Sequence, residues 1–181
     1  MARDGAVLAE GVHRESRSHT ASLPLLVERV LGDAGLALED VEGIAVSIGP
    51  GSFTGLRIGL ALAKGLAFAG GLPLVGVPTL EALAWVVDAA PGTSVCAALD
   101  ARKREVYGAV LGAHARLLPF ATHHPRGGVI ARLGAARLAA GEAANVGTLE
   151  PVYVRPPDAA LPRSRSRSDR RDPARARARS A

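Results

Sequence analysis

The sequence has few cysteines and few aromatic residues. Its 181 residues include one cysteine, Cys96, and only 3% are Phe, Trp or Tyr. One cysteine excludes an internal disulfide framework and a cysteine-rich zinc site, and it suits a reducing compartment. So few aromatic side chains leave no platform on which nucleic-acid bases could stack. Hydrophobic residues nevertheless make up 48% of the chain, which is enough for a folded core.

The excess of positive charge lies at the C-terminal end of the sequence. Residues 163–181 contain eight arginines and two aspartates, whereas residues 1–162 contain 14 basic and 15 acidic side chains. The net charge of +5 therefore belongs to a tail, and the body has no basic stripe for nucleic acid. The tail lacks Leu, Ile, Val and aromatic residues, so we expect it to be disordered. Two interpretations of the tail stay open, a solvated extension and an arm that holds RNA phosphates.

One apolar run raises the question of a membrane span. Residues 58–77 contain a single charge, Lys64, but 70–73 (GGLP) would break a helix in the middle of the run. A buried helix followed by a buried strand explains this pattern better than a span. The first residues lack the apolar core of a secretory signal. We therefore predict a cytoplasmic protein without a membrane partner.

Hydrophobic periodicity predicts alternating strands and helices followed by a hairpin. We expect helices with the N-caps Ser22 and Thr79, a hairpin over 95–111 and a less regular helix over 130–140. The other predicted elements are strands over 5–12, 43–48 and 72–77 and a helix over 55–69. This order indicates an α/β lobe over residues 1–92, a shortened second lobe over 93–162 and the tail over 163–181.

The predicted helix over 55–69 is apolar on nearly every side, so it must be buried on more than one side. Small residues recur every four positions and would form a groove for close approach of another helix. We therefore predict a subunit interface, although the second lobe of the same chain could cover the helix instead. Arg57 and Lys64 are candidates for partner salt bridges or a phosphate contact. The predicted interface residues are Gly55, Leu56, Arg57, Gly59, Leu60, Ala63, Lys64 and Ala67.

A glycine-rich loop precedes this helix, but its spacing matches neither a dinucleotide fingerprint nor a P-loop. It comprises Gly49, Gly51, Ser52, Phe53 and Thr54. We expect Ser52 and Thr54 to form the turn and cap the helix, because no His and acid suggest a triad with them. The five histidines are scattered and lack metal-ligand spacing, so no metal site and no catalytic residue are predicted. The charged residues Asp100, Arg102 and Glu105 are expected in a solvated turn.

Several motifs together resemble the bacterial TsaB (YeaZ) family. The specific ones are 49–59 (GPGSFTGLRIG), 63–67 (AKGLA) and 76–84 (GVPTLEALA). Shorter matches occur at 18–26 (SHTASLPLL), 99–107 (LDARKREVY) and 151–155 (PVYVR). The resemblance implies a two-lobed actin/Hsp70/sugar-kinase-like fold, here without its first strand, which carries an Asp-Thr pair. A misplaced start, a fragment or a degraded gene copy would explain that difference.

The same resemblance implies a function. Members are non-catalytic partners of the subunit TsaD and act with the ATPase TsaE to threonylcarbamoylate adenosine in ANN-decoding tRNAs. The helix that matches 55–69 lies in the interface with TsaD, and a homodimer is an alternative assembly. The complex uses ATP, whereas this chain alone is expected to bind no cofactor and to contact tRNA only indirectly. The competing predictions are a small ATPase or phosphotransferase that uses the glycine loop and an RNA binder that uses the tail.

Overall fold

A computed structural model describes residues 1–12, 19–87, 90, 93–102, 104–111, 115–116 and 125–154 of the chain. The helices are α1 (His19–Asp33), α2 (Phe53–Gly70), α3 (Thr79–Trp85) and α4 (Gly127–Ala139), with a 3-10 turn at Leu38–Asp40. The strands are β1 (Ala2–Arg3), β2 (Ala6–Val7), β3 (Ile44–Gly49), β4 (Leu74–Pro78), β5 (Ser94–Arg102), β6 (Glu105–Leu111) and β7 (Ala115–Arg116).

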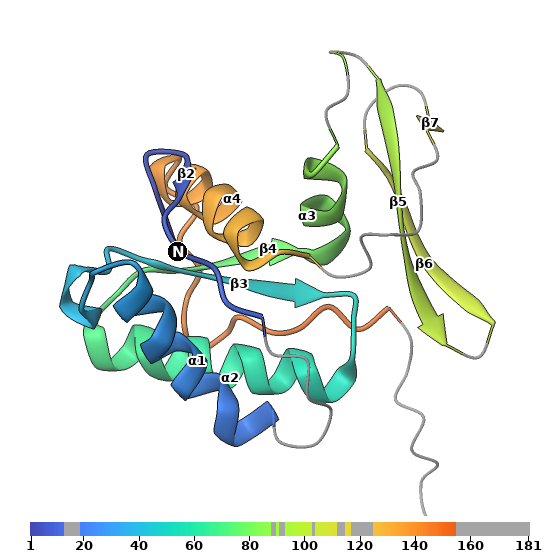
Figure 1. Cartoon of the computed structure of the whole chain (residues 1–181). Coiled ribbons are helices and arrows are strands. Elements are labelled where there is room, and N and C mark those ends of the chain that lie inside the picture. The colour runs from blue at the N-terminus through green and yellow to red at the C-terminus, as the bar shows by residue number, and fades with distance from the viewer. Residues whose placement is uncertain are drawn as a thin grey trace, which may run out of the picture.

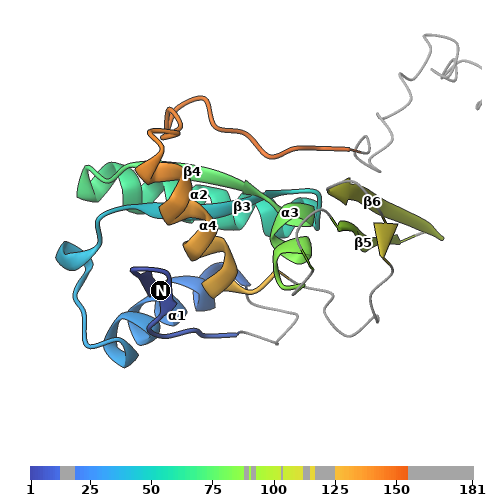
Figure 2. The ribbon, with the colours of Figure 1, turned by 90° about the horizontal axis from the view of Figure 1, so that it is seen from above.

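Strands β3 and β4 form a parallel pair between two layers of helices. Ile44 pairs with Leu74 and Val46 with Gly76, and α2 makes the crossover between the strands. Helices α1 and α2 lie on one side of the pair and α4 lies on the other (Figures 1 and 2). Four of the five residues of β4 are buried, as expected for a strand covered on both faces. The predicted β–α–β order of residues 43–78 is confirmed.

A second sheet has the strand order β6-β5-β7 and lies beside α3. Strands β5 and β6 form the antiparallel hairpin that the sequence predicts over 95–111, with Val95 opposite Leu111. One face of the hairpin packs on α3 through a cluster of buried apolar residues. These are Leu80, Leu83, Ala84, Val95 and Ala97.

The predicted division of the chain at residue 93 does not describe its packing. Helix α4 places Ile130 in one cluster with Val77 and Ala82, which precede that boundary. Beyond α4, the amide of Ala144 donates to the carbonyl of Leu74, and the amide of Val152 donates to that of Ile48. Residues 127–152 thus return to the β3–β4 pair, because both faces of these apolar strands need cover. The residues 163–181 of the predicted tail lie outside the described part.

Several predicted boundaries are wrong at the helix starts. Helix α1 begins at His19, so Ser22 is inside the helix, and α2 begins at Phe53, so Thr54 is helical and not a cap. Thr79 is the first residue of α3 and follows the cap residue Pro78. Its hydroxyl instead lies 2.7 Å from that of Ser47. The helix predicted over 130–140 is confirmed but begins earlier, at Gly127.

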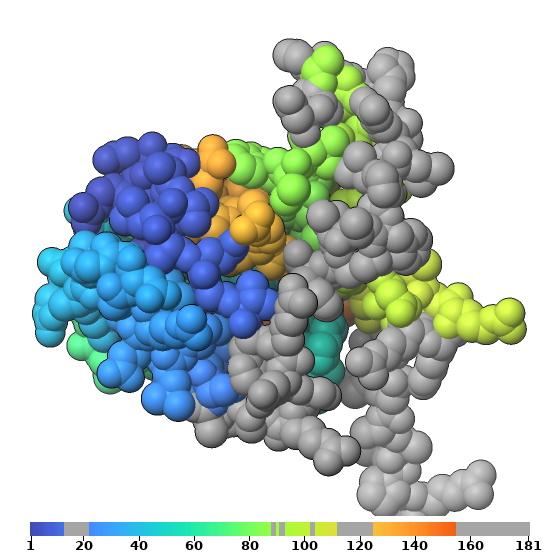
Figure 3. Space-filling model, viewed as in Figure 1, coloured from blue at the N-terminus to red at the C-terminus, as the bar shows by residue number. Residues whose placement is uncertain are grey.

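Within the predicted strand over 5–12, only Ala6 and Val7 are in a strand, and they form a short hairpin with Ala2 and Arg3. Asp4 and Gly5 both have positive φ, at 50° and 77°, and they reverse the chain between β1 and β2. This hairpin lies against α4, as the dark blue and orange surfaces in Figure 3 show. Val7 is one contact, since a Cβ at Gly128 would lie 2.8 Å from its side chain.

Candidate interaction surface

The candidate surface is built on helix α2. Ser52 is its N-cap, and its hydroxyl accepts a hydrogen bond from the amide of Gly55 at 3.3 Å. The helix ends at Gly71, whose φ of 61° is a left-handed conformation that favours glycine. The capping role predicted for Ser52 is confirmed, whereas Thr54 is an exposed residue of the first turn.

One side of α2 is buried in the chain's own core. Ala63 and Ala67 pack with Leu74 of β4, and Ala67 is only 1% exposed. Leu60 is buried as well. The prediction that these three residues contact a partner is therefore wrong. The small side chains of Ala63 and Ala67 instead let the helix lie close to the β3–β4 pair.

Beside α1, a strip of α2 that faces away from the β3–β4 pair remains apolar and exposed among the described residues. Only 22% of the helix is buried. By length and composition alone, it is long and apolar enough to cross a membrane. Phe68 is 85% exposed, and Ala61 and Gly65 are also exposed. A Cβ added at Gly65 would meet nothing within 4 Å. The same holds for Gly59, which lies on the other flank of the helix, nine residues before Phe68. The predicted excess of apolar surface is thus present, and Ala61, Gly65 and Phe68, which lie outside the predicted interface, form part of it.

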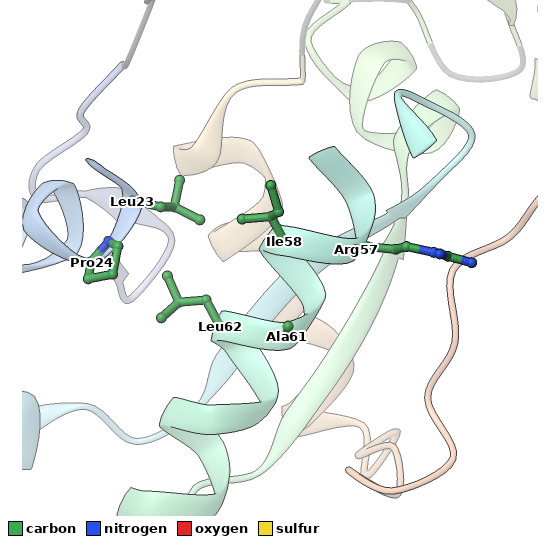
Figure 4. Close-up of a pocket in the computed structure, with 6 residues that line it drawn as sticks. All are labelled: Leu23, Pro24, Arg57, Ile58, Ala61 and Leu62. Carbon is green, nitrogen blue, oxygen red and sulfur yellow. The ribbon is translucent and has the colours of Figure 1, made fainter. Parts of the chain in front are cut away.

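A pocket of about 370 Å³ lies where α1 meets this side of α2. Leu23 and Pro24 of α1 face Ile58, Ala61 and Leu62 of α2 across the pocket, and Arg57 forms part of its rim (Figure 4). Figure 4 also shows that the head of Arg57 points away from the pocket. An apolar lining of this kind can accept an aliphatic or aromatic group but supplies no acid or base.

Arg57 contacts the chain's own C-terminal segment. Its guanidinium carbon lies 3.8 Å from the ring centroid of Phe53, and its Nε donates a 2.8 Å hydrogen bond to the hydroxyl of Tyr153. The two aromatic rings are 5.2 Å apart. Lys64 also contacts this segment, since its ammonium donates to the carbonyl of Gly147 at 3.3 Å. The sequence did not predict the contact of Arg57 with Tyr153 or that of Lys64 with Gly147.

The same C-terminal segment covers the glycine loop. Gly49 has a φ of 113°, and a Cβ there would lie 2.8 Å from the carbonyl oxygen of Val152. Gly49 is therefore required both for its conformation and for this close approach. Leu56 lies beneath the loop, 3.7 Å from the position of a Cβ at Gly51. The loop is thus packed against Val152 and Tyr153.

No group of three or more His, Cys, Asp or Glu side chains in the described part of the chain could hold a metal ion. Of the histidines, His13, His114, His123 and His124 lie outside the described residues. Asp100 and Arg102 lie in β5 and Glu105 begins β6, so these residues belong to the strands and not to the predicted turn. Asp100 and Glu105 each have an interaction partner. Cys96 is a free, half-buried thiol on β5.

Comparison with known proteins identifies the family. The family model described as TsaD, tRNA N6-adenosine threonylcarbamoyltransferase, matches residues 7–118, which is more than half of the chain. The TsaB protein of Escherichia coli K12 is 45% identical over 94 residues, and that of Haemophilus influenzae is 40% identical over 92 residues. The chain belongs to this family and is similar to the proteins named TsaB. Both relatives are named tRNA threonylcarbamoyladenosine biosynthesis proteins.

The matches to these two relatives are partial. Each covers 50% of this chain, and the chain spans about 40% of the length of either relative. A tRNA N6-adenosine threonylcarbamoyltransferase of Cereibacter sphaeroides KD131 is 56% identical over a shorter stretch of 62 residues, 34% of this chain and 17% of that enzyme.

Solved structures confirm the fold class. YeaZ from Pseudomonas aeruginosa superposes with a TM-score of 0.65 at 29% identity, covering 78% of this chain and 87% of that one. A second structure, described as an uncharacterized protein with similarity to peptidase YeaZ from Pseudomonas aeruginosa, has a TM-score of 0.61. The actin/sugar-kinase-like α/β architecture that the sequence resemblance implied is thereby confirmed.

Proposed function

We propose that this chain is a non-catalytic partner of a TsaD-type subunit in the threonylcarbamoylation of adenosine in ANN-decoding tRNAs. The family membership supports the pathway, and the apolar side of α2 supports the mode of action. The chain docks through this helix and thereby supports the catalytic subunit, and it makes no covalent bond itself. In this role it is a cytoplasmic protein that contacts tRNA only through the complex.

The observation that carries the proposal is the uncovered side of α2. A helix of 18 residues with Phe68 85% exposed is costly in water, because about 25 cal/mol is gained for each Å² of apolar surface buried. Exposed apolar surface of this extent is typical of protein–protein interaction sites. The core contacts of Leu60, Ala63 and Ala67 argue against an alternative in which α2 leaves the fold to span a membrane.

The proposal assigns ATP to other members of the complex. A TsaE-type subunit binds and hydrolyses it, and this chain binds no cofactor alone. Two features support this division: the packing of Val152 against the glycine loop and the absence of a candidate metal cluster from the described residues. A small ATPase or phosphotransferase would need both an accessible loop and carboxylates to hold Mg²⁺.

Reconstitution of the modification reaction tests the proposal. The purified chain is added to the TsaD-type and TsaE-type subunits of the same genome with ATP, threonylcarbamoyl donor and tRNA. Threonylcarbamoyladenosine should form only when the chain is present, and Phe68→Lys should lower its formation at least tenfold at limiting concentration. Val110→Lys, which adds the same charge to exposed β6, is the matched control and should retain activity. Equal product without the chain would contradict the proposal.

A further inference from the structure

Arg57 holds its charged group in a fixed orientation on the outside of α2. The guanidinium lies 3.8 Å from the centroid of Phe53 and 5.6 Å from that of Tyr153. The hydrogen bond from Nε to the Tyr153 hydroxyl fixes its rotation. A guanidinium that is stacked and bonded through Nε loses little further freedom when its two terminal nitrogens bind a ligand. Arg57 is therefore preorganised.

The terminal nitrogens of this guanidinium have no ligand among the described residues. The one hydrogen bond of Arg57 in that part of the chain uses Nε, and no ion pair to Arg57 is formed there. Two other arginines of the chain differ in this respect, since Arg126 pairs with Glu10 and Arg137 pairs with Glu81. Arg57 thus presents two parallel N–H donors, the geometry that carboxylate and phosphate groups accept in a bidentate manner.

The surroundings of Arg57 favour a protein carboxylate over a nucleic-acid phosphate. The neighbouring Val152 and Val154 are exposed and apolar, and the pocket beside the Arg57 stem is lined by aliphatic groups. Lys64, the other cation of α2, is bonded to Gly147. Nucleic-acid surfaces instead need several cations that neutralise successive phosphates. A single arginine beside aromatic and aliphatic groups is typical of the energetic centre of a protein interface.

We propose that the terminal nitrogens of Arg57 bind a carboxylate of the partner subunit, and that the adjoining pocket takes a large apolar side chain of the same segment. This inference rests on the proposed function, since it names the contact that the TsaD-type partner makes. The partner segment then carries an Asp or Glu close to a Leu-, Met- or Phe-sized residue. The carboxylate lies in the plane of the guanidinium, beyond its two terminal nitrogens. The apolar group enters the pocket between Pro24 and Ala61. Arg57 is thereby the specificity-determining residue of the surface.

Calorimetric titration of the full chain with the TsaD-type subunit tests the contact. Arg57→Met should weaken binding about 10- to 100-fold, and Arg57→Lys should weaken it at least fivefold because a lysine lacks the planar fork. Arg132→Met is the matched control. Arg132 is also stacked on an aromatic ring, 4.3 Å from the centroid of Trp85. Its substitution removes the same kind of stacking at a place outside α2, so binding should not change. Affinity of the unchanged chain should fall as NaCl rises, whereas that of Arg57→Met should respond much less.

Substitutions in the partner complete the test. One Asp→Asn or Glu→Gln change should weaken binding of the unchanged chain and leave binding of Arg57→Met unaltered. If the unchanged chain binds and Arg57→Met binds equally well, the carboxylate contact is wrong and the proposed function stands. If the chain binds tRNA alone and loses it with Arg57→Met, the ligand is a phosphate and the inference is overturned. If the unchanged chain does not bind the partner, the proposed function fails and the inference fails with it.

Discussion

The carboxylate of Glu10 accepts a 2.8 Å hydrogen bond from the amide of Gly128, in the first turn of α4. The guanidinium of Arg126 donates to the same carboxylate, with its Nε at 2.9 Å. A negative charge at this place satisfies a free amide and complements the helix dipole. Residues 118 positions apart are thereby joined, and the N-terminal hairpin is held against α4.

Glu10 should make stability depend on pH. Burial raises the pKa of this carboxyl group, but the Gly128 amide and Arg126 outweigh burial and hold the pKa below its ordinary value of 4.5. Because the folded state lowers the pKa, the contribution of Glu10 is complete above pH 4.5 and is lost as the pH falls further. Urea unfolding between pH 3 and pH 7 should show this loss for the unchanged chain.

Removal of the charge should have the same effect at neutral pH. Glu10→Gln should lower the free energy of unfolding by about 1 to 3 kcal/mol at pH 7, because a charged acceptor is lost at a helix start. It should also flatten the pH dependence below 4.5. Glu28→Gln, on the exposed side of α1, should leave both quantities unchanged. Equal stability of the two variants would show that the contact with Gly128 is not maintained in solution.

The two sides of α2 should respond differently to the same substitution. Ala67→Leu adds three carbons beside Leu74 in a filled core and should lower the free energy of unfolding by about 1 to 3 kcal/mol. Ala61→Leu places the same atoms on the exposed side and should change it by less than about 0.5 kcal/mol. Thermal or urea unfolding measures both. The reverse order would mean that α2 is rotated relative to the structure described.

Gly59→Trp should separate folding from binding. A Cβ at Gly59 meets no atom within 4 Å, so the chain should fold with unchanged or slightly higher stability, since glycine disfavours a helix interior. The ring would nevertheless hold an approaching helix away, and affinity for the TsaD-type subunit should fall at least about tenfold. Calorimetry checks the affinity and urea unfolding checks the stability. Unchanged affinity would remove Gly59 from the interface.

Tyr153 should hold the C-terminal segment on the glycine loop. Tyr153→Ala removes the stack with Arg57 and Phe53 and should lower the free energy of unfolding by about 0.5 to 1.5 kcal/mol. The amide of Val152, which donates to Ile48 at 2.7 Å, should then exchange faster with deuterium. Tyr153→Phe keeps the ring and should show a smaller increase. Equal exchange in all three proteins would contradict a role for this ring in holding the segment.

Local periodicity was sufficient to predict most elements of the fold but not the contacts between distant residues. The apolar runs predict β3, α2 and β4, and the charged turn after Leu99 predicts the hairpin. The partners of Arg57 and Lys64 could not be predicted, because they lie 96 and 83 positions further along the chain. The packing of α4 on β3 and β4 likewise joins residues that are far apart in the sequence.

The face of α2 illustrates the same limit. Steps of four residues relate Ala63 and Ala67 correctly to one side of the helix, but they do not say which side meets the sheet. The apolar face of β3 and β4 decides it, since small side chains allow the closest approach of helix and strand. Phe68 and Ala61, which the sequence left outside the predicted interface, consequently form the outward side.

Hydroxyl-radical footprinting of the full chain, alone and with the TsaD-type subunit, tests docking through α2 most directly. The account predicts that Phe68 is oxidised readily in the free chain and is protected in the complex, whereas the exposed ring of Trp85 reacts equally in both. Formation of a complex in which Phe68 stays as reactive as in the free chain would contradict it.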